Sequence, residues 1–192
     1  MYQIQFDRLG FFERSRLMKR KAVFVIVALI AVLLMFVLMM TKDNEANETA
    51  EAQTYVFLVE NGFAPIQACG IMANIALESN FDSNATSGKE EDLYGIMQWS
   101  YMKREHLEDY ANILGKPVSD LETQLMFLVE EITYNTHARG NEWAEFWKAN
   151  DPAKAAEIFS DLYIRPAVSP NNVLSVKAQE FYDEYKDVII KN

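Results

Sequence analysis

The sequence has few of the residues on which several large classes of protein depend. Its 192 residues include one cysteine, Cys69, and two histidines, His106 and His137. A single cysteine excludes an intramolecular disulfide framework and a zinc cluster built on thiolates. Two histidines leave little material for a histidine-rich metal site. We therefore expect neither a metal ion nor another cofactor.

Basic residues are also scarce relative to acidic ones. The chain has 18 Lys and Arg against 28 Asp and Glu, a formal net charge of −10. A nucleic-acid-binding protein needs a basic face, so this balance argues against a nucleic-acid partner. Hydrophobic residues make up 50% of the chain and charged residues 24%, which excludes a fully disordered protein. The length suits one globular domain with an appendage.

The charge is divided by a long apolar run at residues 22–40, which reads AVFVIVALIAVLLMFVLMM. Residues 1–21 carry a net charge of +4 and residues 41–192 a net charge of −14. As a helix the run is about 28 Å long, close to the hydrocarbon thickness of a bilayer. Because basic flanks stay in the cytoplasm, the run predicts a single-pass anchor with a cytoplasmic N-terminus.

A cleaved secretory signal is the alternative to this anchor. Ala50-Glu51-Ala52 resembles a small-x-small cleavage site, but the apolar run exceeds the about 7–15 residues of a signal core. We therefore predict a cytoplasmic basic segment (1–21), a transmembrane helix (22–40), an acidic tether (41–51) and an exported domain (52–192). The predicted location is a bacterial cell membrane, with the folded domain outside the cytoplasm.

The exported domain is predicted to be α+β and mostly α. Apolar spacing and helix-end signals predict six helices. They are expected at 52–60, from Pro65 to about Glu78, at 102–114, from a capping box at Ser119 and Glu122 onward, at 151–163 and at 172–188. Residues 80–91 are polar and predict a loop or hairpin, and residues 94–99 are compatible with a short strand.

One acidic residue interrupts the apolar face of the second predicted helix. Ile71, Met72 and Ile75 form a stripe, and Glu78 follows at the same spacing. We expect Glu78 near the helix C-terminus, where apolar neighbours and the helix dipole both raise the pKa of a carboxyl group. A carboxyl group protonated near neutral pH can act as a general acid. A glutamate that points to water, or one paired with Lys or Arg, fits the same pattern.

Three short motifs around Glu78 resemble the active-site region of the lysozyme superfamily. They are ESNF at residues 78–81, AT at 85–86 and YGIMQ at 94–98. Animal c-type lysozymes carry very similar motifs in this order, and goose-type lysozymes and soluble lytic transglycosylases share a looser version. The resemblance implies a lysozyme-like fold with a short β-hairpin. It also implies that Glu78 protonates the glycosidic oxygen.

The rest of the region is most similar to the bacteriophage tail-type lysozyme family. The similarity is carried by GIMAN at 70–74, GIMQWS at 95–100, QLMFL at 124–128 and YIRP at 163–166, and it covers about residues 52–188. Such domains occur in phage tail proteins and in wall hydrolases of conjugative elements. The resemblance implies peptidoglycan glycan strands as the substrate. Conjugation, secretion or phage-tail machinery are the candidate partners.

The second catalytic carboxylate of c-type lysozymes has no clear counterpart in this sequence. Those enzymes carry an aspartate directly before the YGI motif, where this chain has Leu93. Asp92 lies one residue earlier, and a shift of one residue on a strand turns a side chain to the opposite face. Asp82 and Asp92 are therefore the candidate second acids. Alternatively, Glu78 works alone, assisted by the substrate.

Gln98, Tyr94 and Ser79 are the candidate substrate-binding residues. Gln98 would contact a sugar. Tyr94 would stack on a sugar ring or fill the core. Ser79 would form a hydrogen bond with Glu78 or cap the end of the helix. The resemblance thus implies a muramidase that cuts between N-acetylmuramic acid and N-acetylglucosamine. The alternatives are a lytic transglycosylase with the same glutamate and an inactive module that binds glycan.

Overall fold

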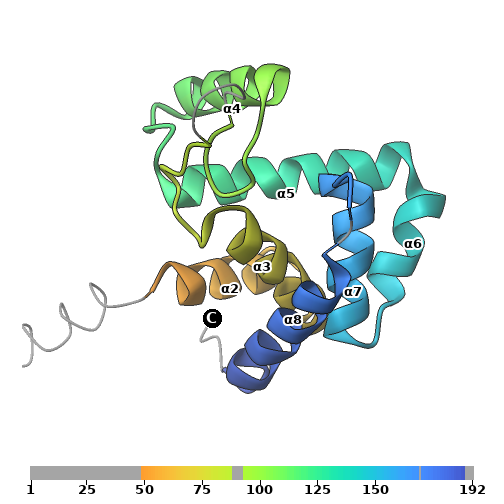
Figure 1. Cartoon of the computed structure of the whole chain (residues 1–192). Helices are drawn as coiled ribbons and strands as arrows, with labels where there is room; N and C mark the ends of the chain where they lie inside the picture. Colours follow the sequence, from red (N-terminus) through yellow and green to blue (C-terminus); the bar gives the residue numbers. More distant parts are fainter. Residues whose placement is uncertain (1–48, 88–92, 169, 189–192) are drawn as a thin grey trace, which may run out of the picture. The chain divides into compact units, whose positions relative to one another are not determined.

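The computed structural model describes residues 49–87, 93–168 and 170–188, and Figure 1 traces their path. The elements are α2 (Ala50–Glu60), α3 (Pro65–Ser79), α4 (Tyr101–Leu114), α5 (Leu121–Ala138), α6 (Gly140–Lys148), α7 (Pro152–Phe159), the π-helical turn η1 (Ser160–Ile164) and α8 (Asn171–Tyr185). The predicted membrane helix at 22–40 lies outside the described residues, as do segment 1–21 and most of the tether. Among the helices that are described, none is long and apolar enough to cross a bilayer.

Local sequence signals set the ends of the first two helices. The Thr49 side chain accepts a hydrogen bond from the backbone of the first turn, and α2 begins at Ala50. The last two residues assigned to the tether are therefore helical. After α2, Gly62 takes a φ of 91°, which a residue with a side chain rarely adopts. Pro65 then opens α3, as predicted, because its fixed φ suits a first helical position.

The capping box predicted for the long helix is wrong. Helix α5 begins at Leu121, and the carboxylate of Asp120 accepts a hydrogen bond from the backbone N–H of Thr123 at 3.0 Å. A carboxylate at this position also interacts with the positive end of the helix dipole, an advantage that a hydroxyl group lacks. Ser119 instead uses its backbone oxygen to accept a hydrogen bond from the Ser83 hydroxyl at 2.7 Å.

Helix α3 is the central helix of the domain and packs against α2, α7 and α8 (Figure 1). Residues 67–75 are all buried, so this helix has no exposed face here, in contrast to the one-sided stripe predicted. Gly70 allows the close approach of α7, because a Cβ atom there would lie 2.8 Å from the backbone nitrogen of Ala156. The buried Asn74 amide donates to the backbone oxygens of Gly70 and Ala156 at 2.9 and 3.1 Å.

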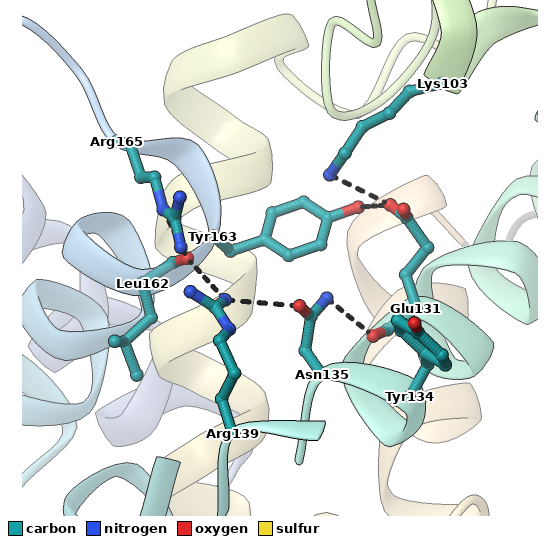
Figure 2. A pocket seen from close by; sticks show the side chains of 8 residues that line it. All are labelled: Lys103, Glu131, Tyr134, Asn135, Arg139, Leu162, Tyr163 and Arg165. Carbon is teal, nitrogen blue, oxygen red and sulfur yellow. Dashed lines mark hydrogen bonds and ion pairs between the residues drawn. The ribbon is translucent and has the colours of Figure 1, made fainter. Parts of the chain in front are cut away.

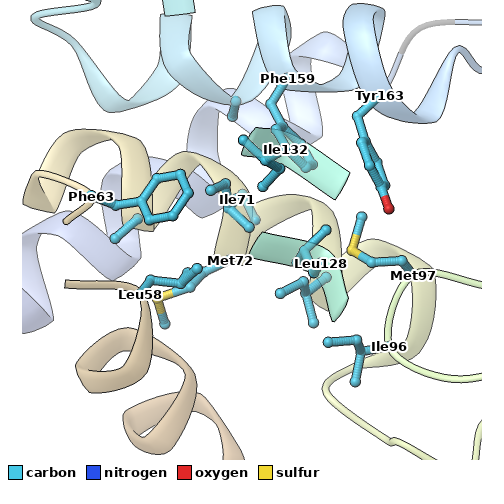
Figure 3. Close-up of a cluster of buried hydrophobic side chains, with 14 of the residues drawn as sticks. Leu58, Phe63, Ile71, Met72, Ile96, Met97, Leu128, Ile132, Phe159 and Tyr163 are labelled. Atoms are coloured by element: carbon cyan, nitrogen blue, oxygen red, sulfur yellow. The ribbon is translucent and has the colours of Figure 1, made fainter. Parts of the chain in front are cut away.

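The hydrophobic core joins this helix to segments far away in the sequence (Figure 3). The fully buried side chains of this cluster include Leu58, Ile71, Met72, Ile96, Leu128, Ile132 and Phe159. Ile96 and its neighbour Met97 come from the predicted strand, and their buried side chains attach that segment to the core. The aromatic residues Trp143 and Phe146 of α6 are also buried.

Candidate active site

Glu78 lies in the last turn of α3, which ends in a left-handed residue, Asn80. The Glu78 side chain is half-buried, and the described part of the chain offers its carboxyl group no hydrogen bond or ion pair. Burial raises the pKa of Glu78 above its ordinary value. The negative end of the helix dipole acts in the same direction. The position predicted for Glu78 near the end of a helix is thus confirmed, and among the described residues no Lys or Arg pairs with it.

Several residues with side chains, two of them at this helix end, have left-handed backbone conformations. Asn80, Phe81, Gln98 and Tyr101 have φ values of 52°, 63°, 49° and 42°, in the left-handed region. Asparagine tolerates this region, but a bulky residue such as Phe81 does not. Such conformations cost about 1–3 kcal/mol each and gather at functional sites. Tertiary contacts must therefore hold the chain in place after Glu78.

Residues 94–99 form a closed loop, the motif loop, where a strand was predicted. The N–H group of Tyr94 donates to the Trp99 oxygen at 3.0 Å, and the N–H group of Trp99 donates back at 2.9 Å. Between them Gly95 takes a φ of 76° and Gln98 one of 49°, so the chain turns. Within the described ranges no strand forms, and the expected hairpin is reduced to isolated bridges of Tyr94 with Trp99 and Thr86.

Two of the predicted substrate-binding residues hold the motif loop in position. The Ser79 hydroxyl donates to the backbone oxygen of Ile96 at 3.0 Å. The Gln98 amide nitrogen donates to the backbone oxygens of Gly95 at 3.0 Å and Ala85 at 3.2 Å. Only the side-chain oxygen of Gln98 then remains for a substrate. Ser79 donates to the loop and to its own helix, and makes no bond to Glu78.

Tyr94, the third predicted substrate contact, is 9% exposed and packs in the core. The guanidinium group of Arg104 lies 5.1 Å from the centre of its ring. Burial raises the pKa of the Tyr94 hydroxyl, an effect that Arg104 opposes. So little exposed ring favours packing over stacking on a sugar.

Of the two candidate second acids, Asp82 and Asp92, the structure describes only Asp82. Asp82 is exposed, and its Oδ1 atom accepts a hydrogen bond from the backbone N–H of Asn84 at 2.8 Å. One of its oxygens therefore stabilises the turn that follows α3. Asp92 lies outside the described residues, and Leu93 is partly buried.

Gln124 holds the motif loop from α5, a role that the sequence patterns did not reveal. This fully buried amide accepts a hydrogen bond from the backbone N–H of Ile96 at 2.9 Å, and it donates to the backbone oxygens of Ser83 and Val118, both at 2.8 Å. A Cβ atom on Gly95 would lie 2.5 Å from its Oε1 atom. The sequence feature that could have indicated this role is the position of Gln124, a polar residue next to apolar residues of a helix in the QLMFL motif.

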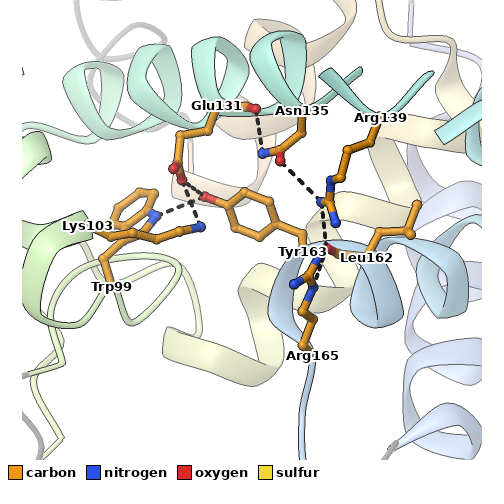
Figure 4. A network of polar contacts seen from close by, with 8 residues as sticks. All are labelled: Trp99, Lys103, Glu131, Asn135, Arg139, Leu162, Tyr163 and Arg165. Carbon is orange, nitrogen blue, oxygen red and sulfur yellow. Dashed lines mark hydrogen bonds and ion pairs between the residues drawn. The ribbon is translucent and has the colours of Figure 1, made fainter. Parts of the chain in front are cut away.

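A second polar network fastens the other end of the motif loop (Figure 4). The indole N–H of Trp99 donates to the Tyr163 hydroxyl at 2.9 Å, and that hydroxyl donates to the Glu131 carboxylate. The Lys103 ammonium group lies 3.2 Å from the same carboxylate and 4.2 Å from the centre of the Tyr163 ring. Burial, and then the charge of Glu131, raise the pKa of Tyr163 well above its usual range. The phenol therefore remains a donor.

A metal site and a cysteine nucleophile are two other kinds of reactive centre that the described residues can be tested for. In the ranges described, no group of three or more His, Cys, Asp or Glu side chains could hold a metal ion. Cys69 is buried in α3, and burial raises the pKa of its thiol to about 12. A thiol that stays protonated is a poor nucleophile. The carboxyl group of Glu78 is therefore the candidate reactive group of the site.

This arrangement defines a lysozyme-like domain: a central helix ends in a half-buried glutamate, beside a loop tied to that helix end. The sequence profile of the phage tail lysozyme family matches residues 49–185, and the chain belongs to this family. The resemblance inferred from the sequence motifs is thereby confirmed. A comparison with curated proteins found no match. Family membership indicates a lysozyme-type enzyme that acts on peptidoglycan, by hydrolysis or by transglycosylation.

Proposed function

We propose that the chain is a muramidase, which cuts peptidoglycan between N-acetylmuramic acid and N-acetylglucosamine with Glu78 as the general acid. The observation that carries this proposal is the half-buried carboxyl group of Glu78, which has no hydrogen-bond or ion-pair partner among the described residues and whose pKa is raised by burial. The protonated carboxyl group gives its proton to the glycosidic oxygen as the bond to the sugar breaks. The resulting carboxylate then takes a proton from the water that attacks the sugar.

The test is Glu78→Gln in the full-length chain, measured as clearing of purified cell wall. The substitution keeps the shape of the side chain and removes the proton, so the rate should fall by about 10²–10⁴. Glu60→Gln is the matched control, because Glu60 is an exposed glutamate at the end of another helix. If Glu78→Gln retains more than half of the wild-type rate, Glu78 is not the general acid.

Lytic transglycosylation is the second candidate reaction. It requires a single carboxyl group, and two observations favour it: Leu93 stands where c-type lysozymes carry aspartate, and one oxygen of Asp82 is engaged in a turn. The 6-hydroxyl group of the muramic acid would attack its own C1 atom, and the Glu78 carboxylate would take the proton. Mass spectrometry of the released fragments separates the reactions. A reducing muramic acid indicates hydrolysis, a 1,6-anhydro end indicates transglycosylation, and an inactive glycan-binding module releases neither.

We further propose that residues 22–40 anchor the enzyme in a bacterial membrane, with the N-terminus in the cytoplasm. The apolar run and the change of net charge from +4 to −14 across it support this topology. An anchored enzyme would cut the wall close to the membrane, as suits a conjugation or secretion channel or a phage-tail system. A reporter active only outside the cytoplasm, fused after Asn192, should be active. Recovery of the full-length chain in the soluble fraction would contradict the anchor.

A further inference from the structure

A pocket of about 410 Å³ lies where α5 meets η1 and the first turn of α4 (Figure 2). Its lining includes three cationic side chains, Lys103, Arg139 and Arg165, and one carboxylate, Glu131. This excess of positive charge contrasts with the net charge of −10 of the whole chain. The pocket shares Lys103, Glu131 and Tyr163 with the network that holds Trp99, so it is connected to one end of the motif loop.

The two arginines of the pocket converge on one atom. The backbone oxygen of Leu162 accepts hydrogen bonds from Nη2 of Arg139 at 3.4 Å and from Nε of Arg165 at 3.1 Å. Arg139 also pairs with Glu142 at 3.3 Å, whereas no acidic partner of Arg165 is found in the described part of the chain. Two guanidinium groups this close repel each other, and an anion held between them would relieve the repulsion.

The backbone beneath Arg165 is held against its own preference. Arg165 follows η1 with a φ of 57°, and its N–H group donates to the Ser160 oxygen at 2.8 Å. Asparagine or glycine would adopt this conformation with less strain. Single π-helical turns and left-handed residues with large side chains are both found preferentially at functional sites. The fold therefore holds Arg165 in a backbone conformation that an arginine does not favour, and this conformation fixes where its guanidinium group lies.

We propose that this pocket binds a carboxylate of the peptide stem of peptidoglycan, a proposal that rests on the proposed function. The guanidinium group of Arg165 matches a carboxylate in shape and charge. The ring of Tyr134, 72% exposed, and the side chain of Leu162 provide apolar surface for the alkyl groups of stem residues. The enzyme would then select strands that carry peptide stems over bare glycan.

The test is calorimetric titration of the full-length Glu78→Gln variant, in which the proposed catalytic acid is absent. The probes are the stem tetrapeptide L-Ala-γ-D-Glu-L-Lys-D-Ala with free carboxylates, the same peptide with its carboxylates amidated, and glycerol phosphate. We expect the free peptide to bind about tenfold more tightly than the amidated one. Adding Arg165→Asn should weaken binding of the free peptide about tenfold, because asparagine suits the backbone and removes the charge. Adding Lys154→Gln, which removes one positive charge from α7, should leave binding unchanged.

Several outcomes would overturn this assignment. They are no binding of the tetrapeptide, equal binding of its amidated form, or equal binding after Arg165→Asn. Tighter binding of glycerol phosphate than of the tetrapeptide would assign the pocket to a phosphate polymer. None of these results depends on cleavage, so they leave the role of Glu78 intact. Conversely, a wild-type chain that fails to cut wall contradicts the proposed muramidase and not the pocket.

Discussion

The hydroxyl group of Ser79 donates a hydrogen bond to the backbone oxygen of Ile96 at 3.0 Å, across 17 positions of the sequence. This bond joins the residue directly after Glu78 to the middle of the motif loop. Ile96 is bonded a second time, because its N–H group donates to the buried Gln124 amide. The loop is thus fixed relative to the proposed acid by its backbone, and its side chains Tyr94, Ile96, Met97 and Trp99 are buried.

Removing the Ser79 hydroxyl should affect activity more than stability. Ser79→Ala loses a hydrogen bond of average strength, so we expect the free energy of unfolding to fall by about 1 kcal/mol. Wall clearing should fall several-fold, because the loop is then less firmly placed against Glu78. Ser175→Ala is the control, since Ser175 donates to Glu157 at 3.1 Å, away from the motif loop. Equal activity losses in the two variants would refute a positioning role for Ser79.

The close contact between Gly95 and the Gln124 side chain predicts that a larger residue at position 95 is destabilising. Gly95→Ala adds a methyl group 2.5 Å from the Gln124 oxygen, at a φ of 76°. Steric overlap and backbone strain together should cost about 2–4 kcal/mol of unfolding free energy. Gly115→Ala separates the two effects, because Gly115 has a φ of 66° with no atom near its added Cβ. That control should lose only about 1 kcal/mol, and denaturant unfolding of both variants measures the difference. Equal losses would mean that the contact with Gln124 does not constrain the loop.

The positions of most helices and the place of Glu78 could be predicted from the sequence because they depend on local signals, whereas α6 was not predicted. Pro65, Gly115 and Asp151 each set a helix end through their own backbone or side-chain chemistry. The apolar spacing that leads to Glu78 is likewise local. The short motifs then pointed to the correct family, although the strand expected within them is a turn.

The contacts that shape the site could not be predicted because they join distant segments. Gln124 reaches the backbone of residues 83, 96 and 118, and no spacing rule connects these positions. The strained φ angles of Phe81 and Gln98 oppose local preference and exist only because tertiary contacts maintain them. The convergence of Arg139 and Arg165 on one oxygen likewise depends on how η1 packs against α5.

The raised pKa of Glu78 predicts how its replacement changes stability with pH. Burial raises the pKa in the folded chain, whereas in the unfolded chain the pKa stays near its usual value of about 4.3. Between these two values the folded state binds more protons, so the stability contributed by Glu78 falls as pH rises. Glutamine stays neutral, so Glu78→Gln should melt a few degrees higher than wild type at pH 7. The two should melt together near pH 3.

Thermal unfolding of the full-length chain at these two pH values checks this prediction. Glu60→Gln is the control, since that exposed residue should give no difference that depends on pH. A melting temperature of Glu78→Gln at or below that of wild type at pH 7 would show that ionised Glu78 is not destabilising. A gain in stability together with a loss of activity would mark Glu78 as a residue kept for chemistry and not for folding.

The Tyr163 hydroxyl should be required for a firm attachment of the motif loop to η1. Tyr163→Phe leaves the buried indole N–H of Trp99 without its acceptor, whereas the Glu131 carboxylate keeps Lys103 as a donor. An unsatisfied buried polar group costs about 1–3 kcal/mol, so denaturant unfolding should reveal a loss of that size. Tyr134→Phe is the control, because that ring is 72% exposed and its loss of a hydroxyl should be neutral. A Tyr163→Phe variant as stable as wild type would mean that the network contributes nothing to the fold.

Asp82 can serve either as a second catalytic carboxylate or as a turn residue, and two substitutions separate these roles. The Oδ1 atom of Asp82 accepts a hydrogen bond from the Asn84 backbone at 2.8 Å, and an asparagine oxygen could accept the same bond. Asp82→Asn should therefore keep the turn and reduce wall clearing far less than Glu78→Gln does. Asp82→Ala should lose the turn bond, with about 1 kcal/mol of stability. Asp92→Asn should likewise reduce wall clearing far less than Glu78→Gln does. If Asp82→Asn or Asp92→Asn loses as much activity as Glu78→Gln while it stays folded, that residue is the missing second acid and the single-acid mechanism is wrong.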